Sequence, residues 1–173
     1  MMETHKERIE RTRAAYREAH ARFVKRLSDA PVEAVERVPA DGGWSVAQIG
    51  WHVAAVDAWF ARAVSGDAPG AKPLPAGVEG KPWSELAAGL PSKFEAGKAI
   101  CPPREIHRDD ALNRLSDASA RLDAALAGLP EERGLGYAIT HPVVGTVTLS
   151  QVGDWATAHT IRHNAQAKRV LGA

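Results

Sequence analysis

Two histidines near the end of the chain have the spacing of metal ligands on a helix. His159 and His163 stand four residues apart, so on a helix they share one face and lie about 6 Å apart along its axis. Such a pair is a weak signal alone, because it equally describes one histidine in the core and another at its rim. A third histidine, His52, lies on the apolar face of another predicted helix, and a shared ion explains three inward imidazoles better than three separate core positions do. Three neutral imidazoles suit a divalent ion such as zinc or nickel and leave at least one coordination position open.

Two capping boxes predict the helices that carry these histidines. Ser45 is followed three residues later by Gln48, and Thr148 in the same way by Gln151, so each pair can satisfy the unpaired N–H groups of a helix start. The first of these helices runs to Gly66. Its histidine lies seven residues beyond the cap, whereas the two histidines of the other helix lie 11 and 15 residues beyond theirs. If the two helices are antiparallel, a rise of about 1.5 Å per residue brings all three histidines to one level.

Two further helices complete the predicted framework. Residues 3–28 have apolar side chains at helical spacing, and a proline at position 31 stops that helix. A seam of leucines predicts another long helix, which Gly128 and Pro130 close; it comprises Leu112, Leu115, Leu122, Leu126 and Leu129.

The segments between the helices are rich in glycine and proline. Residues 66–82 are predicted to form a long crossover, with a short helical turn around residues 82–86, and residues 131–147 a structured loop or a small hairpin. We therefore expect an all-α fold, a four-helix bundle with a long crossover between its second and third helices. A single domain should span residues 1–173.

Composition and charge narrow the class of protein. The chain has 173 residues, of which 45% are hydrophobic and 25% charged, as is typical of a soluble globular protein. Its 22 Lys and Arg against 21 Asp and Glu give a net charge of +1, too even for the basic face that binds nucleic acid or an anionic membrane. No apolar run approaches the ~18 residues of a membrane span, and the charged N-terminus lacks the apolar stretch of a signal sequence. The single cysteine, Cys101, cannot form an intrachain disulfide, so we expect a cytoplasmic protein.

Other catalytic motifs find no support in the sequence. A zinc peptidase of the HExxH type needs a glutamate directly after its first histidine, and Thr160 occupies that position. The chain contains no GxSxG nucleophile motif, no glycine-rich phosphate loop and no CxxC pair. Cys101, which two prolines follow, is interpreted as a small structural residue.

The remaining histidines and the tryptophans supply candidate pocket walls. Trp51 adjoins one of the three histidines and Trp155 lies one turn before another, so both are expected to form apolar walls near the ion. His20 and His141 could each line the mouth of a pocket. The other two histidines, at positions 5 and 107, lie among charged residues and are expected at the surface.

Three segments, in order along nearly the whole chain, resemble the DinB/YfiT-like superfamily of metal-binding four-helix bundles. The segments are Trp44-Ser45-Val46-Ala47-Gln48 before His52, then His141-Pro142-Val143-Val144-Gly145 before Thr148, and finally Trp155, His159, His163 and Gln166. The resemblance implies an up-down-down-up bundle in which the second and fourth helices are antiparallel. It implies that the metal ligands are His52, His159 and His163, and that the protein can form a homodimer.

The resemblance also implies a range of activities. Members of this superfamily transfer low-molecular-weight thiols such as bacillithiol or mycothiol to electrophiles, isomerise maleylpyruvate with mycothiol, or are described as metal-dependent hydrolases. We expect a divalent-metal-binding protein that acts on a small-molecule substrate as a metal-dependent transferase, with a low-molecular-weight thiol as cosubstrate and no nucleic-acid partner. A metal-dependent hydrolase and a non-catalytic metal-binding ligand sensor are the alternatives. No residue selects among them, and the catalytic residues and the roles of His20, His141 and Gln166 stay open.

Overall fold

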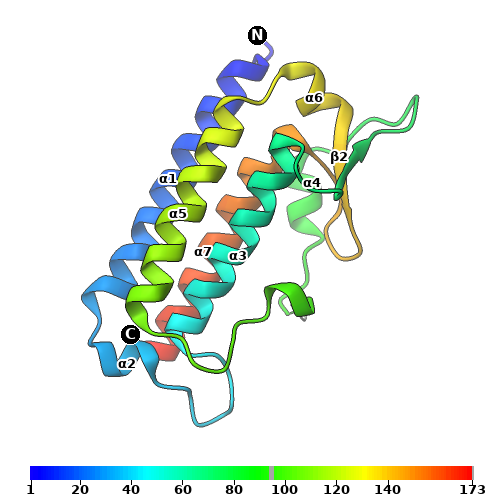
Figure 1. Cartoon of the computed structure of the whole chain (residues 1–173). Helices are drawn as coiled ribbons and strands as arrows, with labels where there is room; N and C mark the ends of the chain where they lie inside the picture. Colours follow the sequence, from blue (N-terminus) through cyan, green and yellow to red (C-terminus); the bar gives the residue numbers. More distant parts are fainter. Residues whose placement is uncertain (94–95, 173) are drawn as a thin grey trace.

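Four long helices lie side by side and form the body of the protein (Figure 1). The structure is a computed structural model that describes residues 1–93 and 96–172. The long helices are α1 (His5–Asp29), α3 (Val46–Ser65), α5 (Arg108–Ala127) and α7 (Val152–Leu171). α3 packs mainly against α5, and α1 against α7, while further contacts join α1 to α5 and α3 to α7. None of the described helices combines the length and the hydropathy that crossing a membrane requires.

Local sequence sets the ends of these helices. The side chains of Ser45 and Gln48 accept hydrogen bonds from each other's backbone N–H groups and form the predicted capping box of α3. Gly66 ends α3 in the left-handed conformation with a φ of 93°, which a residue with a Cβ atom adopts only under strain. The predicted capping box of Thr148 and Gln151 is also present, but it begins a 3-10 turn, η2 (Leu149–Gln151), and α7 follows that turn directly.

Short helical elements lie between the long helices. They are α2 (Val32–Glu36), α4 (Trp83–Ala88), the 3-10 turn η1 (Lys98–Ile100) and α6 (Glu131–Gly136). α4 confirms the helical turn predicted around residues 82–86. α2 and α6 were not predicted, because five or six residues are too few to show a helical period.

A small antiparallel sheet lies beside the upper part of the helices in Figure 1, where the all-α prediction needs correction. β2 (Tyr137–His141) and β3 (Gly145–Thr148) form the hairpin that was one of the two alternatives for residues 131–147. β1 (Ala71–Pro73) pairs with β2 and gives the order β1-β2-β3. This edge strand falls within the predicted crossover, and its three residues include a proline, which an edge strand tolerates. The fold is therefore mostly helical with a three-stranded antiparallel sheet.

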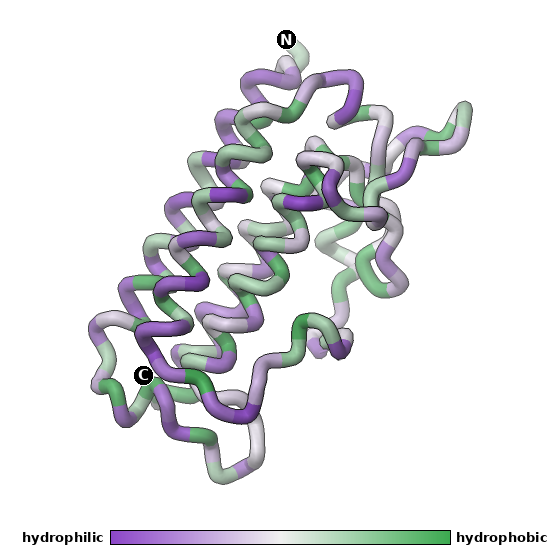
Figure 2. The backbone as a smooth tube through the Cα atoms, in the orientation of Figure 1, coloured by the Kyte–Doolittle hydropathy of each residue, from purple (hydrophilic) through white to green (hydrophobic). Residues whose placement is uncertain are grey.

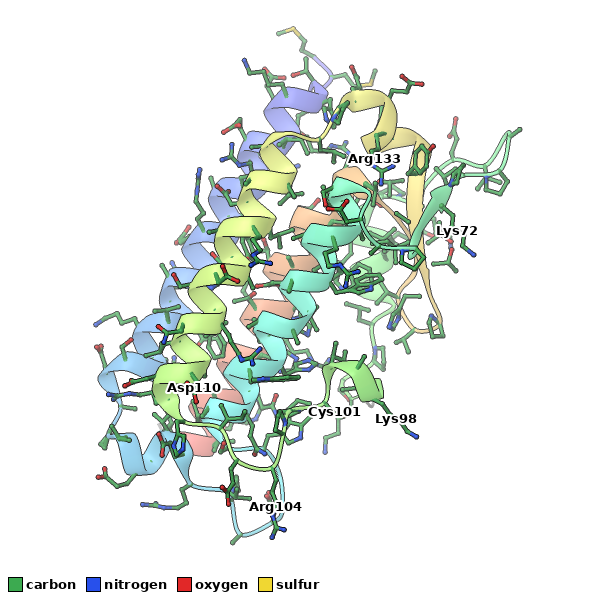
Figure 3. The ribbon with its side chains drawn as sticks, in the orientation of Figure 1. Lys72, Lys98, Cys101, Arg104, Asp110 and Arg133 are labelled. Carbon is green, nitrogen blue, oxygen red and sulfur yellow. The ribbon has the colours of Figure 1, made fainter. Side chains whose placement is uncertain are left out.

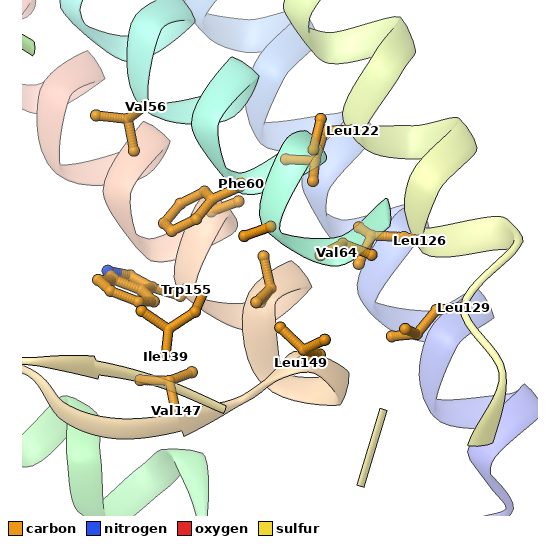
Figure 4. Packing of buried hydrophobic residues seen from close by; sticks show 14 of the residues in the cluster. Val56, Phe60, Val64, Leu122, Leu126, Leu129, Ile139, Val147, Leu149 and Trp155 are labelled. Atoms are coloured by element: carbon orange, nitrogen blue, oxygen red, sulfur yellow. The ribbon is translucent and has the colours of Figure 1, made fainter. Parts of the chain in front are cut away.

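The hydrophobic core of the described residues comprises two clusters, which we call the upper and lower clusters after the parts of the helices in Figure 1 that contribute to them. The upper cluster contains Phe60, Leu122 and Trp155 together with aliphatic side chains of β2 and β3 (Figure 4). The lower cluster contains Phe23, Leu115 and neighbouring aliphatic residues of α3. Figure 2 shows hydrophobic and hydrophilic residues alternating along α1 and α5, as expected for helices with one buried face.

Buried and half-buried polar side chains gather where the two clusters meet, and we call this group the polar band. It consists of His20, His52, Asp57, His159, Thr160 and His163. Along α7 the last buried residue of the upper cluster is Ala156 and the first of the lower cluster is Ala167, so His159 and His163 lie between the two clusters. In α3 the boundary between the two clusters falls after Ala54, so that His52 lies on the side of the lower cluster and Asp57 on the side of the upper cluster.

The connection between α3 and α5, residues 66–107, is held to the helices by the capping glutamines. Gln48 Nε2 donates to the carbonyls of Pro103 and Arg104 at 2.9 and 3.1 Å. Gln151 Nε2 donates to the carbonyl of Lys81 at 2.7 Å. Each capping box therefore begins a helical segment and also fixes a point on the connection.

Candidate metal site

The three predicted metal ligands meet between α3 and α7. His52 comes from α3, and His159 and His163 come from successive turns of α7. One candidate ligand atom of each histidine lies within 4.8 Å of those of the other two. His52 Nε2 is 3.2 Å from His159 Nε2, and the ring centroids of the two histidines of α7 are 4.4 Å apart. The structure therefore brings together all three.

Hydrogen bonds at Nδ1 fix the orientation of two of these imidazoles. His52 Nδ1 lies 2.7 Å from the carbonyl oxygen of Ile100, and since a carbonyl only accepts, Nδ1 carries the proton. His163 Nδ1 lies 2.8 Å from Gln166 Oε1 and donates in the same way. In a neutral imidazole the other nitrogen then carries the lone pair. The Nε2 atoms of both residues are therefore the available ligands.

The spacing of these donor atoms suits a small divalent ion. A tetrahedral ion with bonds of about 2.0–2.1 Å to imidazole nitrogen separates its ligand nitrogens by about 3.3 Å. The 3.2 Å between His52 Nε2 and His159 Nε2 is close to this value. Metal-binding histidines also generally donate their second ring nitrogen to a carbonyl or a polar side chain, as two of the three do. The triad is therefore a set of residues that could hold a metal ion.

Burial favours the neutral form of all three imidazoles. It lowers the pKa of His52, and it lowers the pKa of His163 to about 4, with repulsion by His52 as a second cause. Burial, followed by repulsion from its two neighbours, also lowers the pKa of His159 well below the ordinary value. A neutral imidazole presents a lone pair, so the site does not need to lose protons at neutral pH to bind a metal. Nδ1 of His159 is buried and has no hydrogen-bond partner among the described residues.

A cavity of about 980 Å³ opens onto the three histidines. Its volume is at the upper end of the range for small-molecule sites. The walls come from the segment before α3, from α3, α7, the connection between α3 and α5, and the end of β2; they include Trp44, Ile100, Cys101, His141, Arg162 and Gln166. The charged side chains among the described lining residues are Lys93, Arg162 and Arg169, all of them cationic.

Arg162 joins α7 to the connection that forms one wall. Its guanidinium donates to the carbonyls of Pro91 and Ser92 at 3.1 and 2.9 Å. On the other side, the bond from His52 to Ile100 ties the same connection to α3. The wall is therefore attached to both helices that carry the candidate ligands.

Neither of the two predicted tryptophan walls is among the described residues that line this cavity. Trp51 does not line this cavity, because it lies in a separate hollow, where the Arg114 guanidinium is 5.7 Å from its ring centroid. Successive residues of a helix point about 100° apart, so adjacency to His52 in sequence does not place a side chain on the same face. Trp44 instead packs against His52, with ring centroids 5.0 Å apart. Trp155 is buried in the upper cluster, one turn before the first histidine of α7, and is not among the described residues that line the cavity.

Cys101, which the sequence analysis interpreted as a small structural residue, lies at the surface. It is exposed and lines the cavity, with its Sγ 3.7 Å from the carbonyl oxygen of Ala96. Figure 3 shows Cys101 on the segment that passes beside the lower half of α3.

The remaining histidines divide between core, cavity and surface. His20 is buried, with Nε2 3.2 Å from a backbone carbonyl of α5, so it is a core residue and not part of a pocket mouth. His141 does line the cavity. His107 is exposed, as expected. His5 is not fully at the surface, because it is half-buried with Nε2 2.9 Å from a backbone carbonyl.

Sequence reasoning left two orienting groups of the site unassigned. Gln166 follows His163 by three residues, and this spacing on one helix face was a usable signal for a hydrogen-bonded pair. Ile100 acts through its backbone carbonyl, so its side chain gave no signal.

Comparisons with known proteins agree with this architecture. Residues 15–167 match the DinB superfamily. No curated protein matches the chain. Among solved structures, the chain is similar to a crystal structure described as the conserved protein of locus from Enterococcus faecalis, with a TM-score of 0.62, 20% sequence identity and 94% of each chain covered. At this identity the likeness supports the fold alone.

Proposed function

Since the chain belongs to the DinB superfamily, we propose that it is a metal-dependent enzyme that acts on small molecules. His52, His159 and His163 would hold one divalent ion, zinc or nickel. The reaction would be the transfer of a low-molecular-weight thiol to an electrophile that occupies the cavity.

One observation carries this proposal: the hydrogen bonds of His52 and His163 leave the Nε2 lone pairs available where the three histidines meet. Buried histidines without a shared ligand would have no reason to present Nε2 lone pairs at one place. The cavity above the triad gives a small molecule access to the site. Three protein ligands leave room for a further ligand on the ion, as catalytic metal sites generally do.

The residues around the triad favour thiol transfer over hydrolysis. A divalent ion at three imidazoles supplies Lewis acidity, which lowers the pKa of a bound thiol or water. Activation of water for hydrolysis commonly uses a carboxylate as general base, and the described lining residues include none. Thr160, which replaces the glutamate of the HExxH motif, is fully buried and cannot act as that base. A thiol needs less assistance, because it loses its proton more readily than water does.

The proposal also includes the order of the four long helices and the oligomeric state. We propose the up-down-down-up order for the four long helices, and the meeting of His52 with His159 and His163 at one level of α3 and α7 supports it. We also propose a homodimer, which light scattering of the purified protein tests directly.

Cobalt substitution tests the proposed function. The protein should take up one cobalt ion per chain, and addition of bacillithiol, mycothiol or glutathione should produce a sulfur-to-metal charge-transfer band. The same metal-loaded protein, with zinc or nickel, should then consume the effective thiol together with an electrophile from a panel.

The other outcomes assign the site differently. If no thiol changes the cobalt spectrum while an ester or amide is hydrolysed at a metal-dependent rate, the protein is a hydrolase. If the metal binds and neither reaction occurs across the panel, the transferase proposal is wrong and a non-catalytic metal-binding protein remains.

A further inference from the structure

Arg169 brings a positive charge to the cavity that contains the histidine triad. It lies in the last turn of α7, is exposed and lines the cavity. Its guanidinium has no ion pair and no hydrogen bond with any described residue. The described lining residues also include no carboxylate that could pair with it. The N–H donors of this guanidinium are therefore available to a ligand.

Gln166 adds a second unused donor on the same side of α7. It precedes Arg169 by three residues, so the two side chains are neighbours on the helix surface, about 5–6 Å apart at Cβ. Gln166 Oε1 accepts the hydrogen bond from His163 Nδ1, and its amide nitrogen has no partner among the described residues. Gln166 also lines the cavity. An amide N–H group and a guanidinium therefore border the cavity side by side.

The segment before α3 contributes a part of the wall that carries no charge. Gly42, Gly43 and Trp44 line the cavity there. Asp41 precedes them but is not among the described lining residues, and its Oδ1 accepts a hydrogen bond of 2.9 Å from the backbone N–H of Gly43. Trp44 packs against His52, so an apolar surface connects this wall with the triad. A carboxylate that pairs with Arg169 in this cavity would therefore come from a ligand.

The distance between Arg169 and the triad determines the shape of that ligand. Arg169 follows His163 by six residues, which is about 9 Å along the axis of α7. A molecule with one end at the triad and the other at Arg169 must therefore be elongated. The planar guanidinium matches the geometry of a carboxylate, which accepts two parallel hydrogen bonds from it.

We propose that Arg169 and Gln166 bind a carboxylate of the low-molecular-weight thiol whose sulfur reaches the histidine triad. This inference rests on the proposed function, because it narrows the thiol to those that carry a carboxylate. Glutathione and bacillithiol meet this condition, whereas mycothiol has no carboxylate. Arg169 is thus a specificity-determining residue that lies away from the reacting sulfur.

Lys168 provides a matched control for Arg169. It is the neighbouring residue in the same turn, is exposed, and is not among the described residues that line the cavity. Lys168→Gln and Arg169→Gln therefore remove the same charge from the same helix end, and only Arg169→Gln removes it from the cavity. Arg169→Lys keeps the charge but loses the planar pair of donors.

Glutathione and glutathione diethyl ester are the probes, because the ester has the same skeleton without free carboxylates. Each is titrated into the cobalt-loaded wild type and variants, and the sulfur-to-cobalt charge-transfer band reports binding. Arg169→Gln should bind glutathione roughly tenfold more weakly than wild type, the loss expected for a hydrogen-bonded charged group. Lys168→Gln should stay within about twofold of wild type, because an exposed charge outside the cavity contributes little. Arg169→Lys should fall between them, and the ester should bind all four proteins equally.

Three results would overturn the inference: equal weakening of glutathione binding by Lys168→Gln and Arg169→Gln, an equal loss for the ester in Arg169→Gln, or binding of the ester to wild type as tight as that of glutathione. Absence of a charge-transfer band in wild type with every thiol contradicts the proposed function instead. In that case calorimetric titration of the metal-free proteins with glutarate, which has carboxylates and no thiol, still tests the site. Weaker binding by Arg169→Gln than by Lys168→Gln would support the carboxylate site with another molecule as its source. Equal binding, or none in wild type, would overturn it.

Discussion

Asp57 should make the stability of this protein fall as pH rises, the reverse of the effect of a salt-bridged carboxylate. Its side chain is fully buried, and Oδ2 accepts a hydrogen bond of 2.7 Å from Tyr16 Oη. Oδ1 has no partner among the described residues. Burial raises the pKa of Asp57 from 3.8 to about 7, because a charge in the core lacks solvation. The folded protein therefore holds this proton over a pH range in which the unfolded chain releases it.

The magnitude follows from the difference in pKa between the two states. About three pH units, at about 1.4 kcal/mol each, amount to about 4 kcal/mol of unfolding free energy. This contribution is fully present below pH 3.8, declines as the unfolded chain ionises, and is lost once the pH has risen through 7. Asp57→Asn has nearly the same shape, keeps an acceptor for Tyr16, and does not titrate. Between pH 4 and 7 the wild type should therefore lose about 1.4 kcal/mol per pH unit relative to this variant.

Urea unfolding of metal-free protein at pH 4.5, 6 and 8 measures this difference. The histidine titrations are common to wild type and variant, so they cancel when the two free energies are subtracted. Asp117→Asn, which changes an exposed carboxylate of α5, is the matched control and should differ from wild type by a nearly constant amount. If the difference between Asp57→Asn and wild type is the same at pH 4.5 and pH 8, Asp57 is not kept protonated and the argument from burial is wrong.

The remaining predictions concern the candidate metal site. Replacement of His52, His159 or His163 by alanine should remove most of the bound zinc or nickel in elemental analysis, while alanine at the exposed His107 should not; equal content in all four variants would exclude the site. Metal affinity should fall with acidification only well below pH 6.5, because burial lowers the pKa of the imidazoles, to about 4 in His163. Titrations with a chelator at several pH values check this, and a loss centred on pH 6.5 would contradict it. Gln166→Leu should weaken metal binding about 10- to 100-fold, and Gln166→Glu should preserve it, as competition with a coloured chelator would report.

The features that the sequence predicted well are those that depend on neighbours a few residues away. The capping boxes at Ser45 and Thr148 are local hydrogen-bond patterns, so they located the starts of the helical segments that carry the histidines. Helical spacing then placed His52 on an inward face. The contact between His52 and the carbonyl of Ile100 joins positions 48 residues apart through a glycine- and proline-rich connection, and no local pattern encodes it. Trp51 was misplaced for a different reason: it adjoins His52 in the sequence, but successive residues of a helix point about 100° apart, and it lies against Arg114 of α5 instead.

The ligands of the candidate metal site and the wall of its cavity belong to separate parts of the chain. The histidines lie on α3 and α7, whereas much of the wall comes from residues 66–107. A few hydrogen bonds from Gln48, Gln151, Arg162 and His52 hold that connection in place. Long surface connections accept insertions and replacements at much lower cost than packed helices do. Exchange of this segment would therefore change which molecules enter the cavity, and it would leave the orientation of His52 unchanged only if the backbone carbonyl at position 100 were kept in place.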